Sequence, residues 1–157
     1  MSLNCLASSG ADTLELSLPR RLHSPNATRG YHWRVRHRDT QTWERLIASC
    51  SPALWQPWVL PIVGTRIQGR LLVPRRTPAR RVLTVERQVP SRRNFIHDLD
   101  NLTFSAKPLA DSLRRLGLLY DDSTRWLDLR PVRQTVHPDG QDWTILTLER
   151  ADDERTD

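Results

Sequence analysis

The stretch at residues 95–122 constrains this chain most, because it gathers carboxylates inside a basic protein. It reads FIHDLDNLTFSAKPLADSLRRLGLLYDD and carries two acidic pairs, Asp98/Asp100 and Asp121/Asp122. Ionised carboxylates about 4 Å apart repel by roughly 4 kcal/mol per pair at an effective dielectric near 20. A fold tolerates such a cluster only if a proton, a lysine or a metal ion offsets the charge. Oxygen-only ligands suit Mg²⁺ or Mn²⁺, so the stretch predicts a divalent-metal site.

The residues that precede the first acidic pair have the character of an extended segment. Side chains two apart on a strand point the same way, so Asp98 and Asp100 would share one face. Residues 118–120 would then bring Asp122 back beside the same edge of the sheet. Strand, helix and return together predict one pocket that holds three carboxylates.

A helix is predicted between the two acidic pairs, over residues 105–116. Apolar side chains recur there at helical spacing. Ser105 is a suitable N-cap, Pro108 fits only in a first turn, and Gly117 is a natural C-terminal stop.

Lys107 is the only lysine in the chain, since every other strongly basic residue is arginine. A compact ammonium near carboxylates can act as a point charge on a phosphate or orient a water. The alternative is a helical salt bridge to Asp111, four residues further on. The surrounding carboxylates favour the functional role.

The motif resembles the RusA family of Holliday junction resolvases, including its phage-borne members. The resemblance rests on D-L-D-N at residues 98–101, on Lys107 and Asp111 at helical spacing, and on G-L-L-Y-D-D at residues 117–122. It covers about residues 80–150. The link between Asn101 and Lys107 is longer than in the shortest members, as in the phage branch.

The resemblance implies a Mg²⁺-dependent endonuclease of DNA recombination and repair, with Mn²⁺ as a substitute. Such an enzyme acts as a homodimer on branched DNA and nicks four-way junctions symmetrically. By motif position, Asp98, Asp100 and Asp122 would be the metal-binding and catalytic aspartates. Lys107 would be the catalytic lysine, and Asp121 and Asn101 would be auxiliary residues.

The chain as a whole is basic and of single-domain size. It has 157 residues, a formal net charge of +6 and a sequence pI near 10.5. The charge favours a polyanionic partner, although an arginine-rich codon bias would give the same composition. We expect one domain over residues 13–150, with disordered tails at 1–12 and 151–157.

Arginines on both sides of the acidic motif are candidates for DNA contacts. Residues 20–38 form a predicted loop rich in Arg, His and aromatics, with Arg29 and Arg34 as phosphate ligands. In the resemblance, Asn26 takes the place of an asparagine in a substrate-facing loop. Arg92 and Arg93 would hold the DNA backbone beside the cut or, alternatively, pair with the nearby aspartates.

The rest of the chain predicts an α+β fold. The expected architecture is a mixed, mostly antiparallel sheet with two main helices on one side, RusA-like and homodimeric. The first expected element is a strand at 13–18, with Leu14, Leu16 and Leu18 facing inward. A helix at 39–49 is expected next, with Asp39 or Thr40 as its N-cap and an apolar face that includes Trp43 and Ile47. The remaining expected elements are an irregular Trp-rich connector at 51–61, a hairpin of 65–73 with 81–89, and a closing hairpin across 137–140.

The two cysteines, Cys5 and Cys50, lack metal-ligand spacing and are expected to be free thiols in a reducing compartment. No apolar run approaches the ~20 residues of a membrane span, and the N-terminus lacks the pattern of a signal peptide. We therefore expect a cytoplasmic protein with no membrane partner. The resemblance points to a bacterial, phage or prophage origin.

Structure-selective DNA cleavage is the function that these patterns predict. One alternative is a nuclease of the same fold that acts on flaps or forks. Another is a non-catalytic branched-DNA-binding protein with a structural acidic cluster, and a third is a basic interaction protein with no role on DNA.

Overall fold

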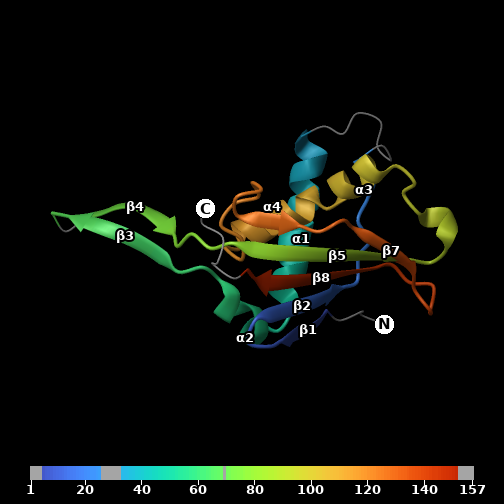
Figure 1. Cartoon of the computed structure of the whole chain (residues 1–157), viewed down its shortest axis with the longest axis horizontal. Helices are drawn as coiled ribbons and strands as arrows, with labels where there is room; N and C mark the ends of the chain where they lie inside the picture. The colour runs from blue at the N-terminus through green and yellow to red at the C-terminus, as the bar shows by residue number, and fades with distance from the viewer. Residues whose placement is uncertain (1–4, 26–32, 69, 152–157) are drawn as a thin grey trace.

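The computed structural model describes residues 5–25, 33–68 and 70–151 of the chain (Figure 1). Its main sheet has six strands in the order β1-β2-β8-β5-β6, with β7 also paired to β5. The pairs of β5 with β6 and with β7 are parallel, and the others are antiparallel. The predicted α+β class with a mixed, mostly antiparallel sheet is confirmed. The strands are β1 (Leu6–Ser9), β2 (Thr13–Leu18), β5 (Arg81–Val89), β6 (Leu127–Leu129), β7 (Arg133–Val136) and β8 (Trp143–Arg150).

Alternating sequence patterns place the inner face of the sheet. The predicted first strand is β2, and its Leu14, Leu16 and Leu18 are all fully buried, as expected. Strand β5 alternates in the same way along its whole length, with Leu83 and Val85 among its buried side chains. Burial of this kind stabilises by roughly 1.5–3 kcal/mol for each large aliphatic side chain.

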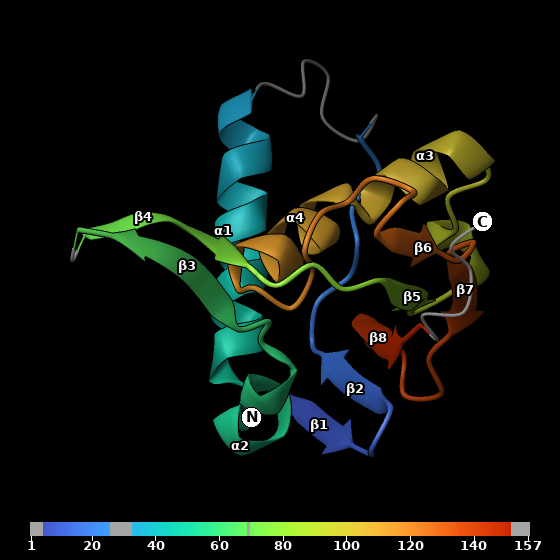
Figure 2. The same ribbon diagram turned by 60° about the vertical axis from the view of Figure 1, so that its left-hand side comes forward.

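Two longer helices, α1 (Trp33–Ser49) and α4 (Lys107–Arg115), cover one face of the sheet (Figure 2). Trp43 and Ile47 of α1 and Leu109 and Leu113 of α4 are fully buried in one core cluster. The Ser112 hydroxyl of α4 also donates a 2.8 Å hydrogen bond to the backbone of α1. The two predicted main helices correspond to α1 and α4, and α3 (Leu99–Ser105) is a third, shorter helix that was not predicted separately.

Helix α1 begins earlier than its sequence pattern predicted. Either Asp39 or Thr40 was expected to cap a helix at 39–49, but both residues lie inside α1. Asp39 forms an ion pair with Arg20, and the Thr40 hydroxyl donates to the Arg36 carbonyl at 3.0 Å. Because α1 extends back to residue 33, part of the predicted basic loop is helical instead. The tertiary ion pair overrides the local preference of Asp and Thr for a cap.

The Trp-rich connector contains α2 (Pro52–Trp55) and the 3-10 helix η2 (Gln56–Trp58). Trp55 and Trp58 are buried in the core cluster, so they pack against this domain. The Trp58 indole also donates to the Ser9 hydroxyl at 3.1 Å. That contact ties the connector to β1.

A separate two-stranded sheet projects from the body, as Figure 1 shows. It consists of β3 (Ile62–Ile67) and β4 (Arg70–Arg76), and the chain reverses near Gln68, whose φ is +51°. The predicted hairpin of 65–73 with 81–89 is therefore wrong. Residues 65–73 had been interpreted as one strand, whereas the structure divides them between β3 and β4.

The closing hairpin is also wrong as a strand pairing. Its turn is present, with Gly140 at φ +64° and a 3.0 Å hydrogen bond from Gly140 N–H to the His137 carbonyl. The strands that flank this turn, β7 and β8, lie on opposite sides of β5 rather than against each other. A turn motif fixes a local reversal, while the partner of each strand is chosen by the whole sheet.

The N-terminal segment is tied to the domain. Residues 6–9 were expected to be disordered, but they form β1 and pair with β2. Cys5 and Cys50 were expected to be free thiols, and the structure joins them in a disulfide with a Cα–Cα distance of 5.3 Å. Sequence spacing could not reveal this pairing, because β1 must first bring Cys5 to the end of α1. Residues 1–4 and 152–157 lie outside the described residues.

Among the described residues, no helix is long and apolar enough to cross a membrane.

Candidate functional site

The acidic motif lies in the connection between two parallel strands, β5 and β6. Parallel neighbours require a crossover connection, and α3 (Leu99–Ser105) with α4 supplies it. This topology places the first acidic pair at the start of the crossover and the second pair at its end.

Asp98 caps helix α3 instead of ending a strand. Its Oδ1 accepts hydrogen bonds from the backbone N–H groups of Asp100 at 2.9 Å and of Asn101 at 3.2 Å. Its Oδ2 accepts from Asn101 Nδ2 at 3.0 Å. Asp100 lies in the first turn of the helix. The expectation that Asp98 and Asp100 share the face of a strand is wrong, because an aspartate followed by acidic and amide residues is also a helix N-cap pattern.

A buried arginine holds the segment that leads into Asp98. Arg87 on β5 is 3% exposed and donates hydrogen bonds of 2.8 Å to the carbonyls of Leu22 and Asn94. Burial, followed by the charge of Arg21, lowers the pKa of Arg87 to about 10.

The side chain of Gln134 on β7 completes this support. Its amide exchanges two 2.9 Å hydrogen bonds with the backbone of Ile96, and it accepts a 3.0 Å hydrogen bond from Arg87. Sequence reasoning missed both Arg87 and Gln134. Arg87 could have been noticed, because it is a charged residue at an inward-facing position of an alternating strand.

The predicted helix at 105–116 is divided at Ala106. Ser105 ends α3 and donates its hydroxyl to the Leu102 carbonyl at 2.6 Å, so it is not the predicted N-cap of the second helix. Pro108 lies in the first turn of α4, and Gly117 follows its last turn with φ +80°, both as predicted.

Lys107 begins α4 and joins the two parts of the motif. Its ammonium forms an ion pair with Asp122, and its Nζ lies 3.5 Å from Asp111 Oδ1. Arg36 of α1 reaches Asp111 from the other side, with Nη2 2.9 Å from Oδ2. The salt bridge to Asp111, which was the alternative considered for Lys107, is therefore present, and the functional role of Lys107 stays a prediction.

These charges line a pocket of about 410 Å³ between α1 and α4. Its lining residues are Arg36, His37, Thr40, Lys107, Asp111, Arg114, Arg115 and Asp122. Arg115 is held in place by Glu44 at 3.2 Å and by His37 Nδ1 at 3.4 Å. Four cationic side chains face two carboxylates, so the pocket suits a ligand that carries negative charge.

The two aspartates that end the motif point to different places. Asp122 faces this pocket, whereas Asp121 lies 3.8 Å from Arg114 and lines a neighbouring one. Asn101 and Lys107 meet in a third, smaller pocket of about 150 Å³, to which Arg36 also contributes. The structure therefore brings Asn101, Lys107 and Asp122 into linked pockets.

Three carboxylates are not gathered into one metal site in this arrangement. Among the described residues, no group of three or more His, Cys, Asp or Glu side chains is placed to hold a metal ion. The carboxylate of Asp98 is used in capping, and that of Asp122 is neutralised by Lys107. The donor set in this arrangement does not fit the predicted Mg²⁺ ion, so the metal-binding roles of Asp98, Asp100 and Asp122 stay a prediction.

The predicted DNA-contacting residues fall in several places. Arg34 is exposed in the first turn of α1. Arg92 and Arg93 are exposed in the 3-10 helix η3 (Arg92–Asn94), and neither forms an ion pair with an aspartate among the described residues. Asn26 and Arg29 lie outside the described residues. Sequence reasoning missed the arginines of α1 and α4 that line the pocket, because their convergence depends on how two helices pack.

The chain was compared with models of known protein families and with curated proteins, and neither comparison gave a match.

Proposed function

We propose that this protein is a structure-selective endodeoxyribonuclease that cuts four-way DNA junctions by paired symmetric nicks. The observation that carries the proposal is the meeting of Lys107, Asp111 and Asp122 in one basic pocket. These three positions have the spacing that resembles the RusA family. Because Lys107 contacts both aspartates, these three residues of the motif lie at one site, and that site favours anionic ligands.

The residues around this pocket have chemistry suited to a DNA phosphate. The planar guanidinium groups of Arg36, Arg114 and Arg115 can hold phosphate oxygens through paired N–H donors. The ammonium of Lys107 offsets the charge of Asp122 and is available as a point charge beside a bound phosphate. Together they would position a phosphodiester next to Asp111 and Asp122.

We further propose that cleavage requires Mg²⁺, which Mn²⁺ can replace, and that the active form is a homodimer. The metal requirement rests on the resemblance, and it needs Asp98 and Asp122 to exchange their present partners for the ion. The dimer follows from the substrate, because two symmetric nicks call for two sites related by a two-fold axis.

A second candidate is a non-catalytic protein that binds branched DNA. It is favoured by one observation, namely that Asp98 and Asp122 are both engaged by groups of the chain itself. On this alternative the acidic motif is structural, and the basic pocket provides binding alone.

A labelled four-way junction distinguishes the two candidates. We expect Mg²⁺-dependent paired nicks from the wild-type protein, and at least a hundredfold loss of nicking in Asp122→Asn and Asp100→Asn with junction binding retained. Asp139→Asn is the matched control, because Asp139 is exposed in the turn before β8 and far along the chain from the motif.

Junction binding without nicking in either Mg²⁺ or Mn²⁺ would contradict the nuclease and support the binding protein. Nicking of flaps or forks in preference to junctions would keep the nuclease and change its substrate. Light scattering after size-exclusion chromatography tests the dimer, which a molecular mass near 18.2 kDa would refute.

A further inference from the structure

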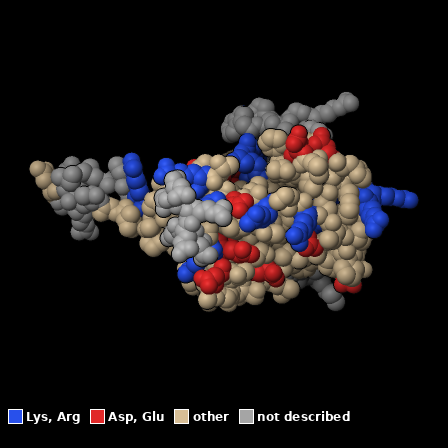
Figure 3. Space-filling model, in the orientation of Figure 1, with Lys and Arg blue, Asp and Glu red and all other residues tan. Residues whose placement is uncertain are grey.

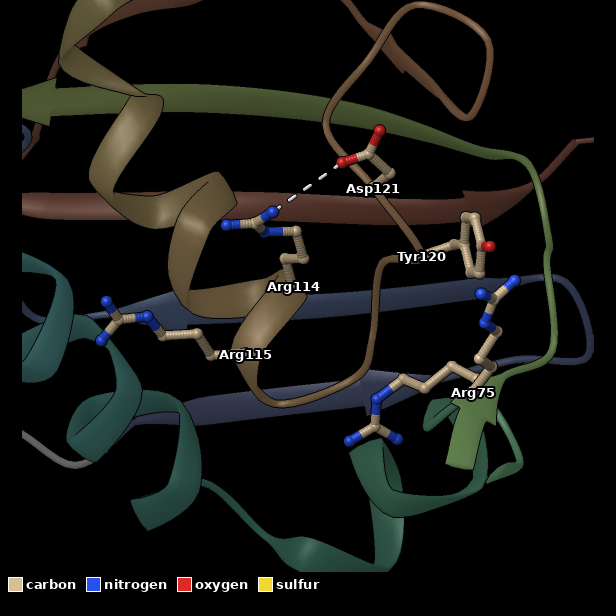
Figure 4. A pocket seen from close by; sticks show the side chains of 6 residues that line it. Arg75, Arg114, Arg115, Tyr120 and Asp121 are labelled. Atoms are coloured by element: carbon tan, nitrogen blue, oxygen red, sulfur yellow. Dashed lines mark ion pairs between the residues drawn. The ribbon is translucent and has the colours of Figure 1, made fainter. Parts of the chain in front are cut away.

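A pocket of about 570 Å³ lies where the β3–β4 hairpin joins the body. We call it the hairpin-base pocket, and its lining residues are Arg75, Arg76, Arg114, Arg115, Tyr120 and Asp121. Figure 4 shows that these side chains come from β4, from the end of α4 and from the loop that follows it. Figure 3 shows Lys and Arg side chains gathered where the hairpin meets the body.

Arg75 is the most available cation of this pocket. It is exposed, and among the described residues its guanidinium makes no hydrogen bond or ion pair. Arg76 is held instead, because it donates to the Leu60 carbonyl at 3.0 Å. Arg114 is only loosely paired with Asp121, at 3.8 Å and with both side chains well exposed, so that pair adds little stability. The pocket therefore has cationic groups to offer a ligand.

Tyr120 supplies an aromatic surface beside these cations. Its ring meets the Trp126 ring edge-on, with centroids 4.9 Å apart and an interplanar angle of 66°. Arg125 in turn lies over the Trp126 ring, 4.9 Å from its centroid. The indole thus supports the edge of Tyr120, while Tyr120 itself lines the pocket and is only partly buried. An aromatic ring among arginines is the combination that binds a nucleotide, by stacking of the base and pairing of the phosphate.

The hairpin-base pocket adjoins the pocket that holds Lys107 and Asp122. Arg114 and Arg115 line both, and Arg36 with Lys107 links the second pocket to the third. The three pockets follow α4 from its first residue to its last. A nine-residue helix is about 13 Å long, so the line of pockets spans several phosphates of a nucleic-acid strand.

We propose that a single-stranded nucleic-acid segment runs along α4, with one nucleotide in the hairpin-base pocket, its base on Tyr120 and its phosphate on Arg75. This rests on the proposed function and deepens it, since it assigns the path of one strand away from the Lys107–Asp122 pair. The volume fits a nucleotide, because small-molecule pockets span about 300–1,000 Å³. An acidic peptide would use the arginines but would gain nothing from the tyrosine ring.

The test measures binding of a 5′-labelled oligothymidylate by fluorescence anisotropy, in EDTA so that no cleavage can occur. We expect Tyr120→Ala to weaken binding about fivefold to a hundredfold and Tyr120→Phe to bind as the wild type does, since only stacking is at stake. Arg75→Gln should weaken binding and reduce the slope of log K against log salt by about 0.7, the value for one phosphate of a single strand.

Arg133→Gln is the matched control for charge. Arg133 is exposed on β7, at the other end of the molecule from the β3–β4 hairpin in Figure 1. Equal effects of Arg75→Gln and Arg133→Gln, together with wild-type binding by Tyr120→Ala, would overturn the proposal. The proposal would also be overturned if polyglutamate competed as strongly as unlabelled oligonucleotide does. That result would indicate an acidic protein partner.

The outcome is independent of whether the protein cuts DNA. If Arg75→Gln and Tyr120→Ala bind the oligonucleotide weakly and the wild-type protein nicks no junction, the nucleotide pocket is supported and the nuclease is contradicted. If the wild-type protein nicks junctions and neither variant changes oligonucleotide binding, the nuclease is supported and the nucleotide pocket is contradicted. Urea unfolding of each variant shows that the binding data refer to folded protein. If Tyr120→Ala does not fold, Arg75→Gln still tests the proposal, because Arg75 is exposed and its substitution should not affect folding.

Discussion

Gly117 connects α4 to the return that carries the second acidic pair, and its substitution by alanine is a sharp test of this region. Its φ is +80°, a conformation that costs an L-residue about 1–2 kcal/mol. A Cβ at this position would also lie where the Arg76 guanidinium now sits. Gly117→Ala therefore perturbs both the backbone and a side chain of the hairpin base.

The magnitude follows from the contacts that would be lost. To make room, Arg76 would have to give up its 3.0 Å hydrogen bond to the Leu60 carbonyl. Hydrogen bonds from charged donors contribute about 1.5–3 kcal/mol, with the lower end suited to a partly exposed arginine. Adding the backbone cost gives a destabilisation of about 2.5–4 kcal/mol, or a decrease of roughly 1–2 M in the urea midpoint.

Gly140→Ala provides the matched control. Gly140 also has a positive φ, +64°, but a Cβ there would meet nothing within 4 Å. It should therefore cost only the backbone part, about 1–2 kcal/mol. Urea unfolding of both variants, and of Gly117→Ala in an Arg76→Ala background, separates the two contributions.

In the Arg76→Ala background, Gly117→Ala should cost no more than Gly140→Ala does. Equal losses for the two glycine variants in the wild-type background would refute the contact of Arg76 with Gly117. That result would also weaken the description of the hairpin-base pocket, because Arg76 helps to place the hairpin.

Two further predictions concern stability under changed conditions. The Cys5–Cys50 disulfide links residues 45 apart, and the chain-entropy model gives such a link a stabilisation of about 4 kcal/mol. Reduction should therefore lower the urea midpoint of the wild-type protein and leave that of a Cys5→Ser/Cys50→Ser variant unchanged. Partial burial, and next the charge of Arg20, lowers the pKa of His23 below its usual 6.5. The unfolded chain then binds the proton more readily, so wild-type stability falls as the pH drops through 6.5, and His23→Gln should lose less over the same range. Parallel pH profiles of wild type and variant would speak against this account of His23.

Local sequence patterns were sufficient for elements whose residues alternate or recur regularly. Leu14, Leu16 and Leu18 identified β2 and its inner face, and Trp43 with Ile47 identified the buried face of α1. These predictions succeeded because side-chain direction is set by the geometry of one strand or one helix. The α+β class followed from the same periodicities.

Strand partners and the exact course of the acidic motif were not available from such patterns. The turn at Gly140 was recognisable, yet β7 and β8 are separated by β5. The D-L-D-N sequence fits both the end of a strand and the N-cap of a helix, and the support given by Arg87 and Gln134 favours the second. Such choices depend on residues that are distant in sequence.

By itself, then, the sequence determined the basic character of the chain, its regular elements and the spacing of Lys107, Asp111 and Asp122. Only the tertiary structure decided that these three residues meet beside the arginines of α1 and α4, that Asp121 and Asp122 face different pockets, and that Cys5 reaches Cys50. The physical reason is the range of the interactions. Periodicity acts within a few residues, whereas an ion pair, a pocket or a disulfide requires that the folded backbone first bring its members together.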